Sequence, residues 1–215
     1  MTSRAGVRMM SSLEERFPSY VLNAPATEVS ELSNGVRVAS EGGHGETATI
    51  GVYIDAGSAY ETEENNGVAH FLEHMIFKGT GKRAQKELEA EIENMGGHLN
   101  AYTSREQTVY YAKVLKDDVG KAVELLSDIL TNSKLDEDAI ERERGTILRE
   151  AEEVSKQYEE VIYDKLHAVA FQKSPLGYTI LGPEENIRSI SKQQLQDYIS
   201  THYTGPHILV AGPGP

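Results

Sequence analysis

The sequence contains no cysteine in its 215 residues. The chain therefore has no disulfide framework, no thiol nucleophile and no cysteine-based zinc site, so any metal ion must be held by histidine and carboxylate side chains. Long apolar runs are also missing, since no stretch reaches the roughly 18 to 20 residues of a membrane-spanning helix. A membrane anchor is not expected.

Basic residues are few, with 21 Lys and Arg against 34 Asp and Glu and a formal net charge of -13. This balance argues against nucleic acid as a partner and, where the acid is clustered, favours cationic ligands. The first twelve residues differ, because they contain Arg4, Arg8 and three serines but no acid. Residues 1–16 are interpreted either as the remnant of a mitochondrial targeting segment or as a disordered terminus.

Residues 17–215 are expected to form one domain, because no repeat, low-complexity tract or long linker divides them. Alternating apolar residues predict strands, and apolar residues three or four apart predict helices. Strands are expected at residues 32–40, 47–56, 98–103, 107–115 and 208–211. Helices are expected at residues 63–77, 84–95, 118–131, 136–155, 159–171 and 192–202. The predicted fold class is α+β, with a mixed, largely antiparallel sheet backed by helices.

The strongest chemical signal is the pentapeptide His-Phe-Leu-Glu-His at residues 70–74. On a helix, His70 and His74 lie one turn apart on the same face and can hold one ion together. Glu73 projects beside that ion, where it could hold a water molecule rather than the metal. This H-x-x-E-H order is the inverse of H-E-x-x-H and is known among metallopeptidases.

A catalytic zinc needs a third protein ligand, and Glu150 in the charged helix is the candidate. Glu143 lies two helical turns earlier and faces the same way. Spacing alone leaves a second interpretation open, in which both are solvated charges on a surface helix. Gly145, between them, weakens the helix by about 1 kcal/mol relative to alanine and has no explanation in the pattern.

Longer segments extend the match beyond the pentapeptide. They are NGVAHFLEHMIFKGT at residues 66–80, GGHLNAYTSREQT at 96–108, IERERGTILRE at 140–150 and PLGYTILGP at 175–183. With these segments the chain resembles the pitrilysin-type peptidases, and within them the mitochondrial processing peptidase branch. The resemblance covers nearly everything after residue 17. It implies one zinc ion per chain held by His70, His74 and Glu150, with Glu73 as general base and Glu143 as a carboxylate that supports catalysis.

The resemblance also implies a set of substrate-binding residues. They are Phe77, Asn100, Ala101, Tyr102, Thr103, Glu160 and Asp164. Residues 100–103 would be an edge strand onto which an extended substrate adds as another strand. Phe77 would line a pocket for the aromatic or apolar residue after the scissile bond, and Glu160 with Asp164 would bind an arginine just before it. Without the resemblance, these residues are a buried strand, core packing and a solvated helix face.

The expected function is that of a zinc endopeptidase that removes basic presequences from proteins imported into mitochondria. Such an enzyme works in the matrix, or on the matrix side of the inner membrane, as the β partner of an α subunit that contributes a glycine-rich loop. Family members have two similar halves, so this chain is expected to correspond to the N-terminal, zinc-binding half and to be inactive alone. Two alternatives remain: a core subunit of the respiratory cytochrome bc complex (complex III), partnered by that complex's subunits, and a general oligopeptidase.

Overall fold

One mixed sheet organises the chain in the computed structural model, which describes residues 26–43 and 45–213. The interpretation of residues 1–16 lies outside the described residues. The strands are β1 (Glu28–Glu31), β2 (Arg37–Glu41), β3 (Thr47–Ile54), β4 (His98–Thr103), β5 (Thr108–Leu115) and β6 (Ile208–Pro213). Their order is β1-β2-β6-β3-β5-β4, with β2 and β6 parallel and the other pairs antiparallel. The predicted α+β class and largely antiparallel sheet are confirmed.

The α-helices that accompany this sheet follow the predicted ranges closely, with two differences. They are α3 (Val68–Ile76), α4 (Gln85–Asn94), α5 (Val119–Asn132), α6 (Glu137–Val154), α7 (Tyr158–Ala170), α8 (Glu184–Ser189) and α9 (Lys192–His202). The short helix α8 was not predicted, because six residues carry too little periodicity to register. Within the described ranges, no helix combines the length and the apolar character required to cross a membrane.

Helix α3 begins at Val68 and not near residue 63 as predicted. Gly67, directly before it, has a φ of 103°, a conformation that favours glycine. A Cβ atom at this position would also lie 2.5 Å from the carbonyl oxygen of Leu181. The chain thus needs glycine here both for its backbone turn and for close packing, and α3 starts only after it.

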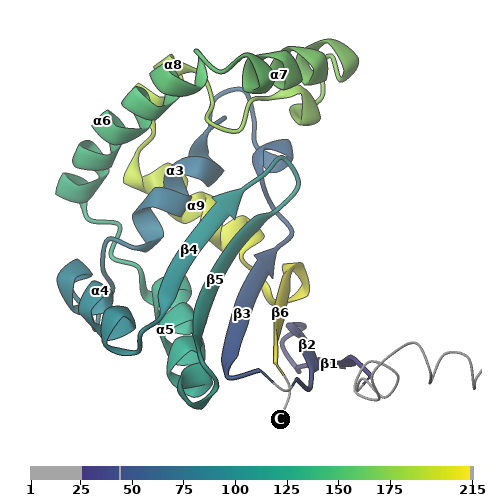
Figure 1. Cartoon of the computed structure of the whole chain (residues 1–215). Helices are drawn as coiled ribbons and strands as arrows, with labels where there is room; N and C mark the ends of the chain where they lie inside the picture. Colours follow the sequence, from purple (N-terminus) through teal and green to yellow (C-terminus); the bar gives the residue numbers. More distant parts are fainter. Residues whose placement is uncertain (1–25, 44, 214–215) are drawn as a thin grey trace, which may run out of the picture.

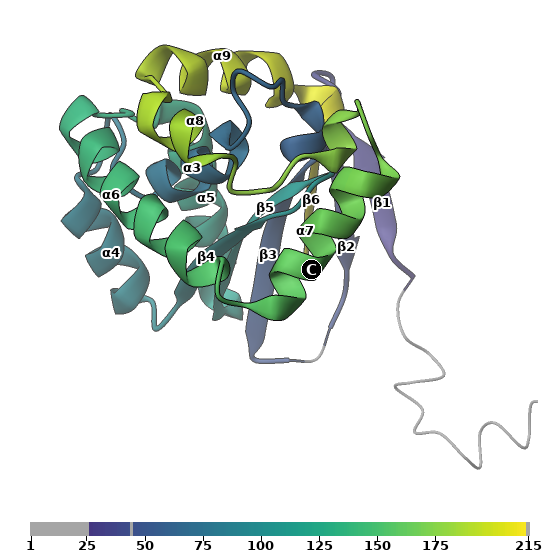
Figure 2. The ribbon, with the colours of Figure 1, turned by 90° about the horizontal axis from the view of Figure 1, so that it is seen from above.

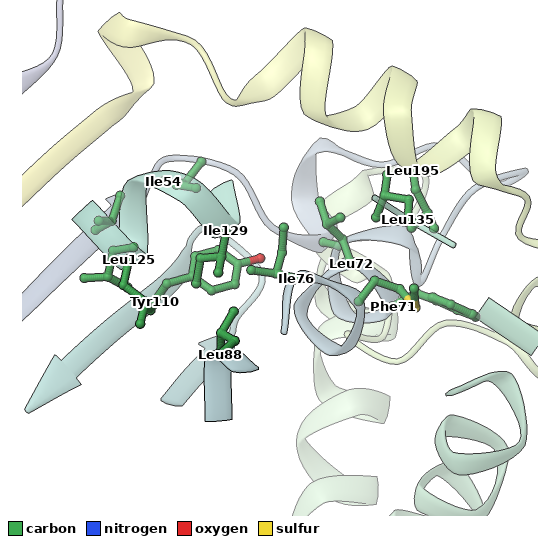
Figure 3. Close-up of a cluster of buried hydrophobic side chains, with 14 of the residues drawn as sticks. Ile54, Phe71, Leu72, Ile76, Leu88, Tyr110, Leu125, Ile129, Leu135 and Leu195 are labelled. Carbon is green, nitrogen blue, oxygen red and sulfur yellow. The ribbon is translucent and has the colours of Figure 1, made fainter. Parts of the chain in front are cut away.

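The hydrophobic core lies between the helices and one face of the sheet. Ile54 of β3 and Tyr110 of β5 point from this face toward Ile129 of α5, and Leu72 of α3 continues the cluster (Figure 3). All four are essentially inaccessible to solvent. The core therefore fixes α3, the helix that carries the histidine motif, against the sheet.

Helix α3 packs against three other elements. It contacts β4 at the end of the sheet order, and it also contacts α6 and α9. Figure 1 shows α7 at the top of the molecule, beyond the ends of the strands, and Figure 2 shows the same helix from above. Residues of α6 and β4 thus lie beside those of α3.

Candidate metal centre

His70 and His74 lie on one face of α3, as the spacing predicts. Their ring centroids are 4.8 Å apart. His70 is buried and the His74 side chain is 21% exposed, so both are shielded while the second still reaches solvent. The apolar side of the same helix is held in the core, which fixes the direction in which the two imidazoles point.

Glu150 completes a group of three ligands from the neighbouring helix α6. Its Oε1 lies 3.5 Å from Nε2 of His70, and its Oε2 lies 3.2 Å from Nε2 of His74. One ligand atom from each residue can be chosen so that all three lie within 4.8 Å of one another. For bonds of about 2.0 to 2.1 Å, tetrahedral zinc ligands are separated by about 3.3 Å. The three residues fit a metal ion, and two imidazoles with one carboxylate are a donor set that leaves a fourth position open.

The charges at this group favour an ionised carboxylate. Hydrogen bonds from His70 and then His74 hold the pKa of Glu150 well below its usual range, although burial opposes them. Burial lowers the pKa of His74, but the hydrogen bonds and charges of Glu150 and Glu143 outweigh this effect and raise it. Glu150 is therefore ionised, which is the form in which a carboxylate binds a metal ion.

Glu143, also on α6, is not a solvated surface charge. Its side chain is only 14% exposed, with Oε2 3.3 Å from Nδ1 of His74 and Oε1 2.8 Å from Nζ of Lys78. A carboxylate on the outer nitrogen of a histidine ligand fixes the ring and its tautomer. Sequence reasoning gave Lys78 no role, although it lies four residues after His74 and just beyond the end of α3.

Glu73 points from α3 toward strand β4. The hydroxyl of Thr103 donates a hydrogen bond of 2.5 Å to its Oε2 atom. Glu73 has intermediate exposure and takes no part in the three-residue ligand group. Glu73 therefore lies outside the candidate ligand group, and its place beside a bound metal stays a prediction.

Strand β4 ends the sheet, so one of its edges has no partner strand among the described residues. Among the described residues, 100–103 therefore lie at a sheet edge, as predicted, and they are not a buried strand; substrate binding there stays a prediction. Exposure alternates along the strand: Asn100 and Tyr102 are exposed, whereas Ala101 and Thr103 are half-buried. The latter two thus share the face that packs against α3, and the former two point to the opposite face.

The remaining predicted residues lie in two separate places. Phe77 follows the last residue of α3, is partly buried and packs edge-on against Tyr110 at 6.2 Å between ring centroids. Glu160 and Asp164 lie on α7, where Glu160 is exposed. Asp164 accepts a hydrogen bond of 2.6 Å from Arg105, so one of the two predicted arginine acceptors already contacts an internal arginine.

A buried carboxylate beside the start of α3 escaped sequence reasoning. Glu61 is 2% exposed and accepts hydrogen bonds of 2.8 Å from the backbone nitrogens of Gly67 and Ala69 and from the side chain of Asn66. It thereby caps the start of α3 from a position outside the helix. No spacing rule identifies such a cap, because the residue lies six positions before the glycine that it contacts.

Comparisons with known proteins agree with this geometry. Residues 37–184 match the sequence profile of insulinase (peptidase family M16). The mitochondrial-processing peptidase subunit beta of Rattus norvegicus is 62% identical over 197 residues, which cover 92% of this chain and 40% of the rat protein. The subunit of the same name from Blastocladiella emersonii is 57% identical over 100% of this chain and 46% of its own length. The chain thus spans less than half the length of these relatives.

A solved structure supports the same assignment. A protease from Helicobacter pylori matches with a TM-score of 0.79 and 26% identity, over 87% of this chain and 46% of the bacterial chain. The family profile covers most of the sheet and both helices that carry the ligand group. The chain belongs to the insulinase family of peptidases, family M16.

Proposed function

We propose that this chain is the metal-binding part of a zinc endopeptidase, the β subunit of a mitochondrial processing peptidase. The observation that carries the proposal is the convergence of His70, His74 and Glu150, with Glu73 beside them. Two imidazoles and one carboxylate are a donor set used by catalytic zinc sites. Relatives that are identical to this chain at more than half of the aligned positions bear the processing-peptidase name.

The proposed reaction is the hydrolysis of a peptide bond. Zinc, when bound, supplies a Lewis acid that polarises the scissile carbonyl and acidifies water. Glu73 takes the proton of the attacking water and returns it to the leaving amine. Glu143 holds the Nδ1–H of His74, which keeps the Nε2 atom available as a ligand. Lys78 fixes the other oxygen of that carboxylate.

The edge of β4 that has no partner strand within the described part of the chain is the proposed place for the substrate backbone. An extended peptide can add there as a further strand through main-chain hydrogen bonds, which accept any sequence. Residues 100–103 run past Glu73, so a strand added beside them would bring its peptide bonds near the ligand group. Phe77 is proposed to contribute to the pocket for the residue after the scissile bond.

Specificity for basic presequences is assigned to acidic side chains, with Glu160 and Asp164 as the proposed contacts for an arginine. The net charge of -13 supports a preference for cationic peptides. The proposed partner is the α subunit, and the proposed location is the mitochondrial matrix or the matrix side of the inner membrane, by analogy with relatives whose names place them in mitochondria.

The test is the substitution Glu73→Gln in the full-length protein assembled with its α subunit. Cleavage of a basic presequence peptide should fall by at least a hundredfold, because the general base is lost, while bound zinc, measured by atomic absorption, stays the same. Glu64→Gln, an exposed acid shortly before α3, is the matched control and should leave both unchanged. Loss of zinc in the Glu73 variant would contradict the assigned role. A different outcome would favour the complex III alternative: wild-type protein that copurifies with haem-containing subunits and does not cleave the presequence peptide.

A further inference from the structure

We propose that Thr103 is a positioning residue: its hydroxyl orients the carboxylate of Glu73, while its backbone belongs to the edge strand β4. This inference rests on the proposed function, in which Glu73 is the general base. It gives the side chain of Thr103 a role that differs from substrate binding. It also ties the base to the same strand that would receive the substrate.

The hydrogen bond between the two residues is short and charge-assisted. The distance from Thr103 Oγ1 to Glu73 Oε2 is 2.5 Å, within the range typical of a hydroxyl on a carboxylate. A threonine hydroxyl has one proton, so donating it to Glu73 leaves none for a substrate carbonyl. Oε1 of Glu73 makes no hydrogen bond within the described parts of the chain, and it is the oxygen left for water.

The backbone around Thr103 makes the hydroxyl a fixed point. Thr103 pairs with Thr108 in the last rung of the β4–β5 ladder, and the next residue, Ser104, closes the hairpin through its backbone contact with Gln107. Alternation along β4 sends the Thr103 side chain to the face that packs against α3. A β-branched residue in a strand has few rotamers, so little freedom remains in the direction of the hydroxyl.

Fixing one carboxylate oxygen has a kinetic consequence. A glutamate has three rotatable side-chain bonds, and a base that is misplaced by about 1 Å can lose about a hundredfold in rate. The Thr103 hydroxyl restricts this motion without contacting the ligand group. Its removal should therefore slow the chemical step, with little change in substrate binding or metal affinity.

The experiment compares Thr103→Val and Thr103→Ser with Thr108→Val in the full-length protein assembled with its partner. Valine keeps the shape of threonine but removes the donor, and serine keeps the donor. Thr108 faces Thr103 across the ladder, and its hydroxyl donates to the carbonyl of Ala56. Thr108→Val thus makes the same substitution on the same rung of the ladder, but the hydroxyl that it removes bonds a backbone carbonyl and not Glu73.

For Thr103→Val we expect kcat to fall about ten- to a hundredfold with KM within twofold of wild type. Thr103→Ser should recover most of the loss. Thr108→Val should lower the melting temperature and leave kcat in place. The visible spectrum of bound Co²⁺, measured on the present chain, should be the same for wild type and Thr103→Val. A raised KM with unchanged kcat would assign Thr103 to substrate binding and overturn the proposal, as would equal loss in the Thr108 variant.

A second measurement does not depend on activity. In crystal structures of the zinc-bound chain, Glu73 should occupy one orientation in wild type and leave it in Thr103→Val. An undisturbed Glu73 in the variant would overturn the positioning role. If wild type binds zinc but does not cleave presequences, the proposed function fails while this structural test of Thr103 still gives an answer.

Discussion

Helices α6 and α7 follow one another in the chain and both carry predicted acidic site residues, yet those of α6 contact the histidines of α3 and those of α7, within the described residues, do not. On α6, Glu143 and Glu150 point at the histidines of α3 and are 14% and 39% exposed. On α7, Glu160 is exposed, whereas the side chain of Asp164 is 31% exposed and accepts a hydrogen bond from Arg105 of the neighbouring hairpin. Packing against α3 thus directs the two glutamates of α6 at the histidines, whereas Asp164 of α7 is directed at an arginine.

The burial of the two helices explains this contrast. Helix α6 anchors itself with Ala139, Ile140 and Ile147 in the core. Helix α7 has no buried residue and exposes apolar side chains along its length, with Tyr158 at 86% and Val169 at 69%. When a helix is held in the core, the positions of its polar side chains are fixed as well.

The largest expected effect belongs to Glu150→Gln. Four-ligand zinc sites bind with about 10 to 16 kcal/mol, so one anionic ligand is worth about 4 kcal/mol, or about a thousandfold in the dissociation constant. Zinc affinity measured by competition with a chelator should fall by about that factor. The matched control is Glu152→Gln on the same helix, whose side chain is 70% exposed and paired with Lys156.

Glu152→Gln should bind zinc as wild type does, since it removes the same charge from the outer face of α6. Equal losses in the two variants would mean that the helix contributes only its general acidity, and the contrast with α7 would disappear. Unchanged affinity in Glu150→Gln would move the third ligand to Glu143.

The next largest effect concerns Glu61, which is more deeply buried than Glu143 and Glu150. Burial raises its pKa from 4.5 to about 7, although the hydrogen bonds from Ala69, Asn66 and Gly67 oppose this. Between pH 4.5 and 7 the folded chain therefore holds a proton that the unfolded chain has released. The free energy of unfolding falls as pH rises through this window, by up to about 3 kcal/mol.

Glu61→Gln should remove that slope, because glutamine does not titrate. Urea unfolding at pH 5 and at pH 8 gives the comparison, with Glu64→Gln as the exposed control that keeps the wild-type slope. If the free energy of unfolding changes between pH 5 and pH 8 by the same amount in wild type and in Glu61→Gln, then Glu61 is ionised at both pH values. Burial would then be the weaker influence on this carboxylate.

The sequence predicts the α6 side of this comparison well for a physical reason. Periodicity and spacing are local, so residues 70–74 on one helix and Glu143 with Glu150 on another could each be assigned to a face. Strands β2 to β6 were likewise found by alternation, whereas the short strand β1 (Glu28–Glu31) was not predicted. That the two helix faces meet could not be derived from spacing, because it depends on how both helices pack, and the family resemblance supplied it.

The unpredicted features are contacts between distant or irregular segments. Thr103 of strand β4 contacts Glu73 of helix α3, Lys78 contacts Glu143 from beyond the end of α3, and Arg105 contacts Asp164 from a hairpin. Glu61 acts on α3 from a loop. None of these pairs has a characteristic spacing, and the late start of α3 depends on close packing at Gly67 that only the fold reveals.

The third prediction tests α7 through substrate choice. Replacing Glu160 with Gln and Asp164 with Asn should reduce the preference for arginine before the cleavage site by about five- to tenfold, or about 1 to 1.4 kcal/mol. The effect is modest because Asp164 shares its charge with Arg105. The measurement is kcat/KM on matched peptides with arginine or alanine at that position.

The control for this pair is the double variant Glu152→Gln with Glu159→Gln, two exposed acids whose removal changes the net charge equally. It should leave the preference as in wild type. If both double variants lose the same preference, arginine is selected by the overall charge, and α7 makes no specific contact.

The smallest effect is expected from Gly145→Ala, on the part of α6 between its two directed carboxylates. Alanine is better than glycine in a helix interior by about 1 kcal/mol. An added Cβ at Gly145 would meet only the Nη1 atom of Arg149 at 3.6 Å, an ordinary contact with the end of a flexible side chain. No described neighbour requires the glycine, so urea unfolding should show a gain of about 1 kcal/mol.

Zinc affinity should not change in Gly145→Ala, because Glu143 and Glu150 keep their helix and their partners. Gly120→Ala in α5 is the control, since its added Cβ would have nothing within 4 Å; it should gain a comparable or smaller amount near the helix start. If Gly145→Ala is stabilised and binds zinc normally but cleaves more slowly in the full assembly, the missing Cβ provides room for a group outside the described residues. The face of α6 that carries Gly145 would then take part in function as well. The difference between α6 and α7 would in that case concern only the sides of the two helices that face the rest of the chain.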